Sequence, residues 1–546
     1  MIFEQTFHRG KNVIRTVPCC SNMIIWKIHK KIIKCIVTLS AISSMYSTQG
    51  FLNRSVFGAK YGIEEESGWS YEMDFYRTFS KKALSACPDY IQIGDYRVEY
   101  MAFSPNVGHS TSGVSRRVNI EPALVLSGDF QHFMSYREFI PKLYKTRPVI
   151  IVSLPSYGGN EQRADELSIF DMANLLNQFL EVLSIPVIDL ISFSLTSLMA
   201  HEFSIRFPEK TNNLVMSGIM AFPRSSFLLK MKQSIRMMDE DFDGFSDALL
   251  LYLFSPRYLS EDESETVYET RPTLKKLDSP GRRLLRQQIK QLDDNQKAQY
   301  KSNISRALNY LMDIEGCNDL GDEQDESHGE GQKGEVEGEV ERKGKMKAFP
   351  KSRTLVLAGE FDHFVLPFEG ANYTNYCEYA EFVLIKNADH LVQINCPETV
   401  LALINNFLQN KALNKIPGVM PLRYEDMDHQ GKRSSLRREP KTSQAWLLSD
   451  SLRMHQMVSV KDINFSGGLM ELPGRCLKQA TLANDLEIQF SGFELKLKIS
   501  VFDKKKNIAR FLFKHTDIEK ARLLIIMLSN AEYFKPRGNG ISHKLS

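Results

Sequence analysis

Residues 187–197 read Val187-Ile-Asp-Leu-Ile-Ser-Phe-Ser-Leu-Thr-Ser197, and this stretch decides the fold. The run before Ser192 is almost wholly apolar, as expected of a parallel-sheet strand that is buried on both faces. Small residues, Ser192 and Thr196, stand two positions on either side of Ser194, so the chain can turn back sharply there. We therefore expect a strand, a tight turn that exposes Ser194, and a helix that begins at once.

This pattern resembles the G-x-S-x-G nucleophile elbow of the α/β-hydrolase superfamily, with Ser192 and Thr196 in place of both glycines. The amides of the helix that follows, that of Leu195 first, would point toward the space above Ser194, where an oxyanion could be held. The alternative is an ordinary strand, turn and helix with polar residues at the turn. The resemblance implies an α/β-hydrolase fold with a mostly parallel sheet and Ser194 as nucleophile.

An acid and a histidine follow Ser194 in the order that this superfamily uses. Asp362 comes just past a short apolar run that begins at Thr354, and His390 follows a second run, Glu381–Ile385. A neutral imidazole can accept the serine proton and return it, while a buried carboxylate fixes its tautomer. We therefore predict His390 as the base and Asp362 as the acid that orients it. The nearby residues Glu360, His363 and Asp389 are interpreted as solvated loop residues.

Two upstream segments, Ala123–Phe130 and Pro148–Gly159, resemble the two early strand ends of the same superfamily. The resemblance implies that the amide of Asp129, with Phe130 as the near alternative, is the second oxyanion donor. Ser127 replaces the usual histidine. The carboxylate of Asp129 would repel a developing negative charge unless it turns away or is protonated.

Composition is that of an ordinary globular protein: of 546 residues, 42% are hydrophobic, 10% aromatic and 25% charged. The formal net charge of +3 gives no reason to expect a nucleic-acid polymer as partner. The eight cysteines show no CxxC spacing, so we expect neither a metal site nor a disulfide scaffold and place the protein in the cytoplasm. Lysines before the apolar run 35–42 loosely imitate an export signal, but the run is too short to span a bilayer and no clear cleavage site follows.

The chain is expected to divide into several parts. Residues 1–87 are interpreted as a partly disordered extension and residues 88–410 as the hydrolase domain. Within that domain, apolar residues at helical spacing predict a helical lid over about 221–316, rich in Met and Phe, and an acidic stretch over about 317–348 predicts a disordered loop. Residues 411–430 are interpreted as a linker.

Residues 431–530 show strand-like alternation and a final amphipathic helix, as in a small β-barrel, and 531–546 form a tail. The segment resembles a PilZ domain, whose ligand signature is R-x-x-x-R followed by [D/N]-x-S-x-x-G. Arg433 and Arg437 match the first half, and Asn464 and Ser466 match the second, with Leu469 in place of the last glycine.

The resemblance implies binding of a cyclic dinucleotide such as cyclic di-GMP as an allosteric ligand. Two guanidinium groups can clamp phosphates and stack on a purine, while Asn464 and Ser466 would add hydrogen bonds. The alternative is a basic linker whose arginines contact water.

Together these features predict a serine hydrolase or acyltransferase acting on an ester or thioester of an apolar acyl group, without a catalytic cofactor and regulated by cyclic di-GMP. No transmembrane segment is expected. Two other classes stay open: a non-catalytic receptor with the hydrolase fold, and an adaptor protein controlled by the nucleotide.

Overall fold

The computed structural model describes residues 75–80, 83–105, 120–137, 139–253, 285, 287–315, 348–427, 438–505, 507–529 and 534–536. Residues 74–546 form one compact unit. The predicted extension up to residue 74, the acidic loop and the two arginines Arg433 and Arg437 lie outside the described residues.

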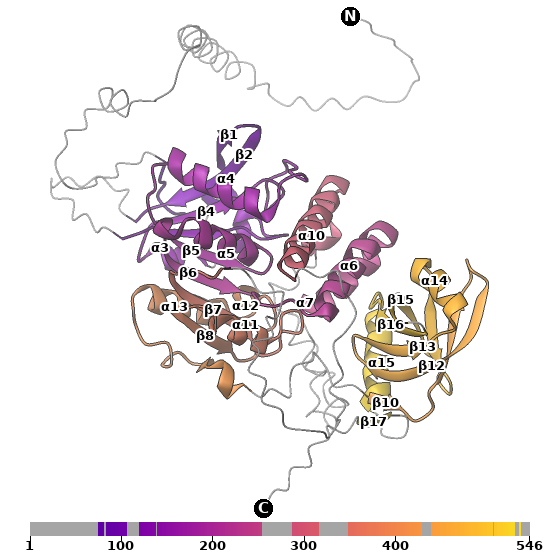
Figure 1. Cartoon of the computed structure of the whole chain (residues 1–546). Helices are drawn as coiled ribbons and strands as arrows, with labels where there is room; N and C mark the ends of the chain where they lie inside the picture. The colour runs from indigo at the N-terminus through magenta and orange to yellow at the C-terminus, as the bar shows by residue number, and fades with distance from the viewer. Residues whose placement is uncertain are drawn as a thin grey trace, which may run out of the picture. The chain divides into compact units, whose positions relative to one another are not determined.

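A mixed sheet with parallel strands at its centre organises the first part of the chain (Figure 1). The described strands run in the order β1-β2-β4-β3-β5-β6-β7-β8-β9, and all pairings from β4 to β8 are parallel. Their bounds are β1 Asp89–Ile93, β2 Tyr96–Phe103, β3 Ala123–Leu126, β4 Val149–Ser153, β5 Ile188–Phe193, β6 Thr211–Ser217, β7 Arg353–Gly359, β8 Ala380–Ile385 and β9 Val419–Leu422. The central strands β3, β4 and β5 are buried along their whole length, which explains their mainly apolar sequences.

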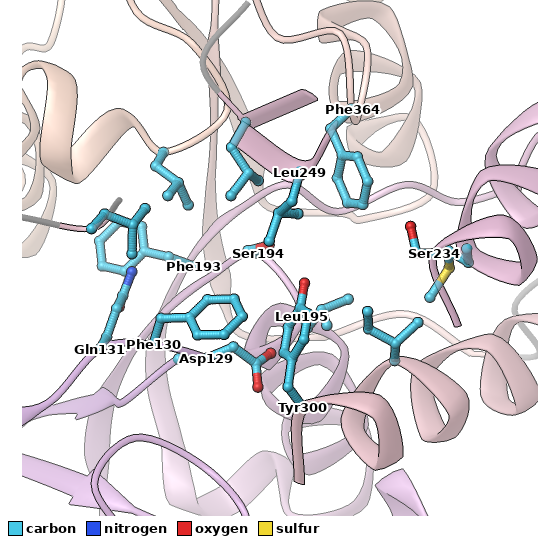
Figure 2. Close-up of a pocket in the computed structure, with 16 residues that line it drawn as sticks. Asp129, Phe130, Gln131, Phe193, Ser194, Leu195, Ser234, Leu249, Tyr300 and Phe364 are labelled. Atoms are coloured by element: carbon cyan, nitrogen blue, oxygen red, sulfur yellow. The ribbon is translucent and has the colours of Figure 1, made fainter. Parts of the chain in front are cut away.

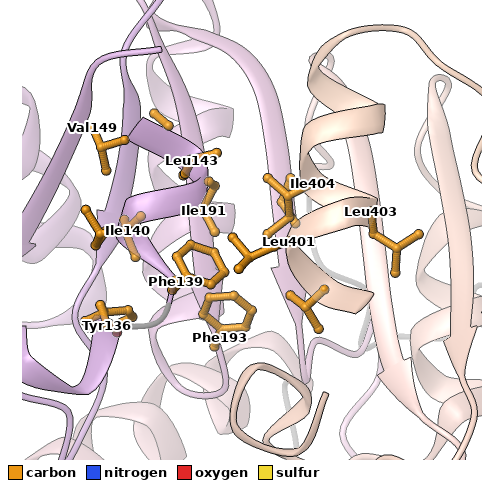
Figure 3. Close-up of a cluster of buried hydrophobic side chains, with 14 of the residues drawn as sticks. Tyr136, Phe139, Ile140, Leu143, Val149, Ile191, Phe193, Leu401, Leu403 and Ile404 are labelled. Carbon is orange, nitrogen blue, oxygen red and sulfur yellow. The ribbon is translucent and has the colours of Figure 1, made fainter. Parts of the chain in front are cut away.

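Helices cover both faces of this sheet. Their bounds are α3 Ile140–Tyr144, α4 Ile169–Val182, α5 Thr196–Arg206, α11 Pro367–Thr374, α12 Val392–Asn395 and α13 Pro397–Leu408. Figure 3 shows α3 and α13 packed against one face, where Ile140 and Leu401 meet Ile191 and Phe193 of β5. This packing fixes the end of β5 from which Ser194 follows.

Between β6 and β7, where the sequence predicts a lid, the structure has helices α6 Ser225–Glu240, α7 Phe242–Leu253 and α10 Asp294–Glu315. Helices α6 and α10 lie side by side (Figure 1), and Lys301 of α10 pairs with Asp239 of α6 at 2.5 Å. Residues 254–284 of the predicted lid lie outside the described residues.

The C-terminal part contains a closed antiparallel barrel. The described strands pair in the order β11-β14-β15-β16-β13-β12, and β12 pairs back with β11, so that six strands close the barrel. Short strands β10 and β17 extend it beside β12. The bounds are β10 Arg438–Pro440, β11 Gln444–Ser449, β12 Met454–Asn464, β13 Gly467–Glu471, α14 Gly474–Leu482, β14 Glu487–Phe490, β15 Lys496–Lys505, β16 Ile508–Phe513, α15 Ile518–Ser529 and β17 Phe534–Pro536. Its core is separate from that of the sheet and includes Val458, Ile488 and Phe511.

The structure corrects three predicted boundaries. The hydrolase domain begins before residue 88, because Phe79 and Leu84 already pack in its core. It also continues into the predicted linker 411–430, since Val419–Leu422 forms an edge strand against β8. The predicted tail contributes Phe534–Pro536, which pairs with β10. The last two errors share a cause: short strands are held by pairing with distant residues, and their own sequence carries little signal.

Candidate active site

Ser194 lies at the tip of the turn between β5 and α5. Its φ is +59°, in the left-handed region that serine seldom adopts. The turn is held by hydrogen bonds from the Ser194 amide to the carbonyl of Ser217, at 2.8 Å, and from the Ser197 amide to the Ser194 carbonyl, at 2.9 Å. Helix α5 follows at once, with Leu195 as its N-cap. Ser194 therefore lies half-buried at the tip of a turn whose backbone is constrained.

The two residues that replace the elbow glycines are both fully buried and hydrogen-bonded. The Thr196 hydroxyl donates to the Phe193 carbonyl at 3.0 Å, which ties the first turn of α5 to the end of β5. The Ser192 hydroxyl donates toward the carbonyl of Val215 in β6 at 3.4 Å. Both positions thus hold side chains without opening the turn.

The need for a glycine appears instead at Gly218, after β6. Its φ is +76°, and a Cβ there would lie 2.9 Å from Cε1 of His390 and 3.3 Å from Cα of Ser194. Gly218 was not among the predicted site residues, because nothing in its local sequence reveals which side chain approaches it in space.

Ser194, His390 and Asp362 form a continuous hydrogen-bonded chain. Nε2 of His390 lies 2.8 Å from Oγ of Ser194, and Nδ1 lies 2.8 Å from Oδ2 of Asp362. The carboxylate can only accept, so Nδ1 carries the imidazole proton and Nε2 is free to accept from the serine. The other carboxylate oxygen, Oδ1, accepts the amides of Phe364 and Val365, each at 2.9 Å. These two amides therefore hold the carboxylate in the orientation in which Oδ2 accepts from the histidine.

Of the alternative acids, neither occupies this position. Asp389 is buried, so the prediction that it is a solvated loop residue is wrong. Its Oδ2 accepts from the side-chain amide of Asn395 at 3.4 Å. Glu360 is exposed and accepts the Asn387 amide at 2.9 Å.

The segment after β3 lies beside Ser194. Gly128, Asp129, Phe130, Ser194 and Leu195 all line one cavity, which brings the two predicted oxyanion donors to the same side of the nucleophile (Figure 2). Phe130 has a φ of +60°, so the chain bends sharply at this point.

Ser127, which stands where the resembled family has a histidine, stabilises this bend. Its hydroxyl donates to the Gln131 carbonyl at 2.7 Å, and the Tyr136 hydroxyl donates to Oε1 of Gln131 at 2.5 Å.

The carboxylate of Asp129 accepts from the side-chain amide of Asn303 in α10, at 2.6 Å. Asn303 also donates to the Ser156 carbonyl at 2.7 Å, and its own oxygen accepts from Arg306 at 2.7 Å. Burial raises the pKa of Asp129 to about 7, against the opposing effects of Asn303 and Arg306. Asn303 was not predicted, because a single Asn on an amphipathic helix carries no distinguishing pattern.

The cavity at Ser194 is small and mainly apolar. Its volume is about 50 Å³, well below the ~300–1,000 Å³ of pockets that hold drug-sized ligands. The apolar lining includes Met231, Leu249, Leu253, Leu285, Ile304, Phe364 and Leu391. Tyr300 and Ser234 also line the cavity (Figure 2). The lid helices α6, α7 and α10 each supply two lining residues, so the described lid covers the nucleophile.

No cluster of three or more His, Cys, Asp or Glu side chains suited to a metal ion occurs among the described residues. Within the same residues, no helix is both long and apolar enough to cross a membrane.

The predicted nucleotide site is described only in its second half. Oδ1 of Asn464 accepts the amides of Ser466, at 2.9 Å, and Gly467, at 3.0 Å, which closes a tight turn between β12 and β13. Arg438, directly after the predicted Arg433 and Arg437, pairs with Ile463, the neighbour of Asn464.

Comparison with known proteins agrees with the fold. The family model for the α/β hydrolase fold matches residues 121–397, just over half of the 546 residues. The chain therefore belongs to the α/β hydrolase family. The matched residues end before the C-terminal barrel, so the match does not test its predicted PilZ identity.

Three solved structures illustrate the likeness. A thermophilic esterase from Thermogutta terrifontis is 17% identical, with a TM-score of 0.42, and the match covers 60% of this chain and 99% of that one. The α/β hydrolase MGS-M2 from a Medee basin deep-sea metagenome library is 15% identical, with a TM-score of 0.41 and coverage of 60% and 98%. The enol-lactonase from Burkholderia xenovorans LB400 is 14% identical, with a TM-score of 0.41 and coverage of 59% and 100%. These distant likenesses say nothing of the substrate. Comparison with curated proteins gave no match.

Proposed function

We propose that this protein is a serine hydrolase or acyltransferase that acts on an ester or thioester of an apolar acyl group. The observation that carries the proposal is the chain of two 2.8 Å hydrogen bonds from Ser194 through His390 to Asp362, which opens into an apolar cavity. Nucleophile, base and orienting acid in this order suit acyl transfer.

The reaction has two halves. Oγ of Ser194 attacks the carbonyl carbon while its proton passes to Nε2 of His390, and the carbonyl oxygen becomes an oxyanion held by the amides of Leu195 and Asp129. His390 then gives the proton to the departing alcohol or thiol, which leaves an acyl ester on Ser194. In the second half, His390 takes a proton from water or an acceptor alcohol, whose oxygen attacks the acyl carbon of this ester. The bond from that carbon to Oγ of Ser194 then breaks, His390 returns the proton to Oγ, and the acyl group leaves as the acid or the new ester.

The test is labelling of the full-length protein with a fluorophosphonate probe, together with hydrolysis of short aryl esters. Wild type should be labelled at Ser194, and Ser194→Ala should lose both labelling and hydrolysis, the latter by several orders of magnitude. Equal ester hydrolysis by wild type and Ser194→Ala would refute the nucleophile assignment. A wild type without labelling would favour a non-catalytic receptor.

We further propose that the barrel is a PilZ-like domain that binds cyclic di-GMP through Arg433, Arg437, Asn464 and Ser466. The pairing of Arg438 with Ile463 supports this, because the backbone that follows the two arginines runs beside the Asn464 turn. A cytoplasmic location and catalysis without a cofactor remain predictions from the sequence.

Calorimetry on the full-length protein tests the nucleotide proposal. Arg433→Ala with Arg437→Ala should remove most of the binding energy, because charge-assisted bidentate contacts are the strong ones. Substitution of Lys504 and Lys505 by alanine is the matched loss of two charges and should change the affinity little. If wild type does not bind at high micromolar cyclic di-GMP, the barrel is not a nucleotide sensor.

A further inference from the structure

Lid helix α6 contacts two different parts of the molecule. Met231 and Ser234 line the cavity at Ser194. Gln233 and Arg236 of the same helix contact the C-terminal barrel instead: Nε2 of Gln233, which is buried, donates to the Leu512 carbonyl at 3.2 Å. The same helix is therefore both roof of the cavity and partner of the barrel.

Arg236 makes the strongest part of this contact. Its guanidinium donates to the carbonyl oxygens of Thr481, at 3.0 Å, and Ala483, at 2.8 Å, and to Oδ1 of Asn484, at 2.7 Å. Glu240, one turn further on, accepts from Arg236 at 2.9 Å and from Nζ of Lys514 in the barrel at 2.8 Å. The side chains of Lys514, Glu240 and Arg236 are 5%, 16% and 24% exposed, so this charge cluster is partly shielded from solvent and costly to break.

Lid helix α7 touches the barrel through an aromatic contact. Leu249 and Leu253 line the cavity, and the adjacent Tyr252 places its ring centroid 6.2 Å from that of His515. The Tyr252 hydroxyl is buried and has no hydrogen-bond partner among the described residues, so the ring carries the contact. From the other side, Nζ of Lys230 in α6 lies 4.8 Å from the same ring.

His515 joins this contact to the Asn464 turn. Its ring stacks on Phe465 with centroids 4.2 Å apart and planes 9° apart. The ring nitrogen Nε2 lies 2.8 Å from the Phe465 carbonyl, which can only accept, so Nε2 carries the proton. Burial lowers the pKa of His515 to about 4, which keeps the ring neutral at pH 7. Phe465 itself stands between Asn464 and Ser466, the two described residues of the predicted nucleotide motif.

We propose that the C-terminal barrel holds lid helices α6 and α7 closed over Ser194, and that a shift of the turn Asn464–Ser466 reaches the lid through Phe465, His515 and Tyr252. The inference rests on the proposed function, since it concerns regulation of the same site. The cavity of about 50 Å³ cannot admit a large acyl group unless these helices move, and the barrel contacts resist that movement.

Hydrogen exchange of the full-length protein tests the holding role without relying on catalysis. Arg236→Ala and Tyr252→Ala should each speed amide exchange in residues 225–253 by about fivefold or more, because local opening becomes easier. Two controls should exchange as wild type. Lys232→Ala lies on the same helix at a residue without a hydrogen bond or ion pair to the described residues, and Tyr252→Phe keeps the ring while removing the unpartnered hydroxyl. Unchanged exchange in β5 and β6 shows that each variant is folded.

Phe465→Ala tests the path from the turn. Exchange in α7 should rise as it does in Tyr252→Ala, although Phe465 touches neither lid helix in this scheme. If only the barrel strands exchange faster, transmission through Phe465 is wrong; if Arg236→Ala and Tyr252→Ala match wild type, the holding role is wrong as well.

Ester hydrolysis separates this inference from the proposed function. In Arg236→Ala the lid should open more readily, so kcat/KM for long-chain aryl esters should rise by about tenfold relative to short-chain esters. Labelling of Ser194 should persist. Absence of Ser194 labelling in wild type would refute the proposed chemistry, but the exchange results would still decide whether the barrel holds the lid.

Discussion

Ser194 is held in a conformation that costs free energy, since a non-glycine residue in the left-handed region is less stable by about 1–3 kcal/mol. The hydrogen bond from its amide to the Ser217 carbonyl and the start of α5 keep it there. The strained turn places the Ser194 hydroxyl where it meets the imidazole of His390.

Although Gly218→Ala adds only one methyl group, it should disturb the contact between Ser194 and His390. The new methyl group would meet Cε1 of His390 at 2.9 Å and force the imidazole away from Ser194. We expect kcat on aryl esters to fall by at least about tenfold, since catalytic geometry tolerates little displacement. Steady-state kinetics and thermal unfolding measure the two effects.

Gly94→Ala is the matched control. Gly94 also has a positive φ, +56°, but no atom lies within 4 Å of the added Cβ. It should lower the free energy of unfolding by about 1–2 kcal/mol from backbone strain alone and leave kcat unchanged. If the two variants lose activity equally, crowding at His390 is not the cause.

Asp129 should make activity depend on pH. Its pKa of about 7 means that the side chain is neutral below pH 7 and charged above, where it opposes an oxyanion nearby. We expect kcat/KM to fall as pH rises through about 7, and Asp129→Asn to abolish this fall. The groups that face Asp129 are Asn303, Arg306, Tyr300 and Tyr157, with His132 in the adjoining cavity.

The same group affects stability with a defined sign. The folded protein keeps the Asp129 proton up to about pH 7, whereas the unfolded chain releases it near 3.8. Between these values the folded state binds more protons, so the free energy of unfolding falls as pH rises and the dependence ends above pH 7. Urea titrations of wild type and Asp129→Asn across this range measure the difference; parallel curves would contradict the raised pKa.

Among the helices, α10 is fixed to the hydrolase domain by buried polar contacts. Asn303 is completely buried and contacts Asp129, Ser156 and Arg306. Asn303→Ala would leave these partners unpaired, so we expect a loss of about 2–4 kcal/mol in the free energy of unfolding. Asn309→Ala, at an exposed position of the same helix, should change stability by less than about 0.5 kcal/mol. Denaturant titration compares them, and equal stabilities would contradict the role of Asn303.

From sequence patterns, strands and helices can be predicted better than the contacts between them. The apolar run before Ser194 and the order of Ser194, Asp362 and His390 are visible in the chain, because strand burial and loop position leave local signals. Gly218 and Asn303 could not be found this way, since each matters only through residues that are distant in sequence. Asp389 was misread for another reason: its partner Asn395 is close in sequence, but the burial of the loop that holds both is visible only in the fold.

At the scale of the molecule, the hydrolase domain ends later than its sequence indicates. Strand β9 pairs with β8 from Ile385↔Val419 to Phe382↔Leu422, and Leu413 is part of the buried core. A chain that ends at residue 410 would expose the edge of β8 and that core. We expect it to be less soluble and to unfold at lower temperature than a chain that ends at residue 427. Both lack the barrel, so only β9 and its approach differ; equal behaviour would contradict the corrected boundary.

The closed lid also changes what a Michaelis constant would mean for this protein. If only a small fraction of molecules is open at any moment, the apparent dissociation constant of a large acyl substrate is the intrinsic one divided by that fraction. A reagent small enough for the 50 Å³ cavity escapes this factor, because it can react with the closed majority. Labelling rates for reagents of graded size should therefore fall once a reagent no longer fits the closed cavity, and the factor by which the rate falls would report the resting population of open molecules.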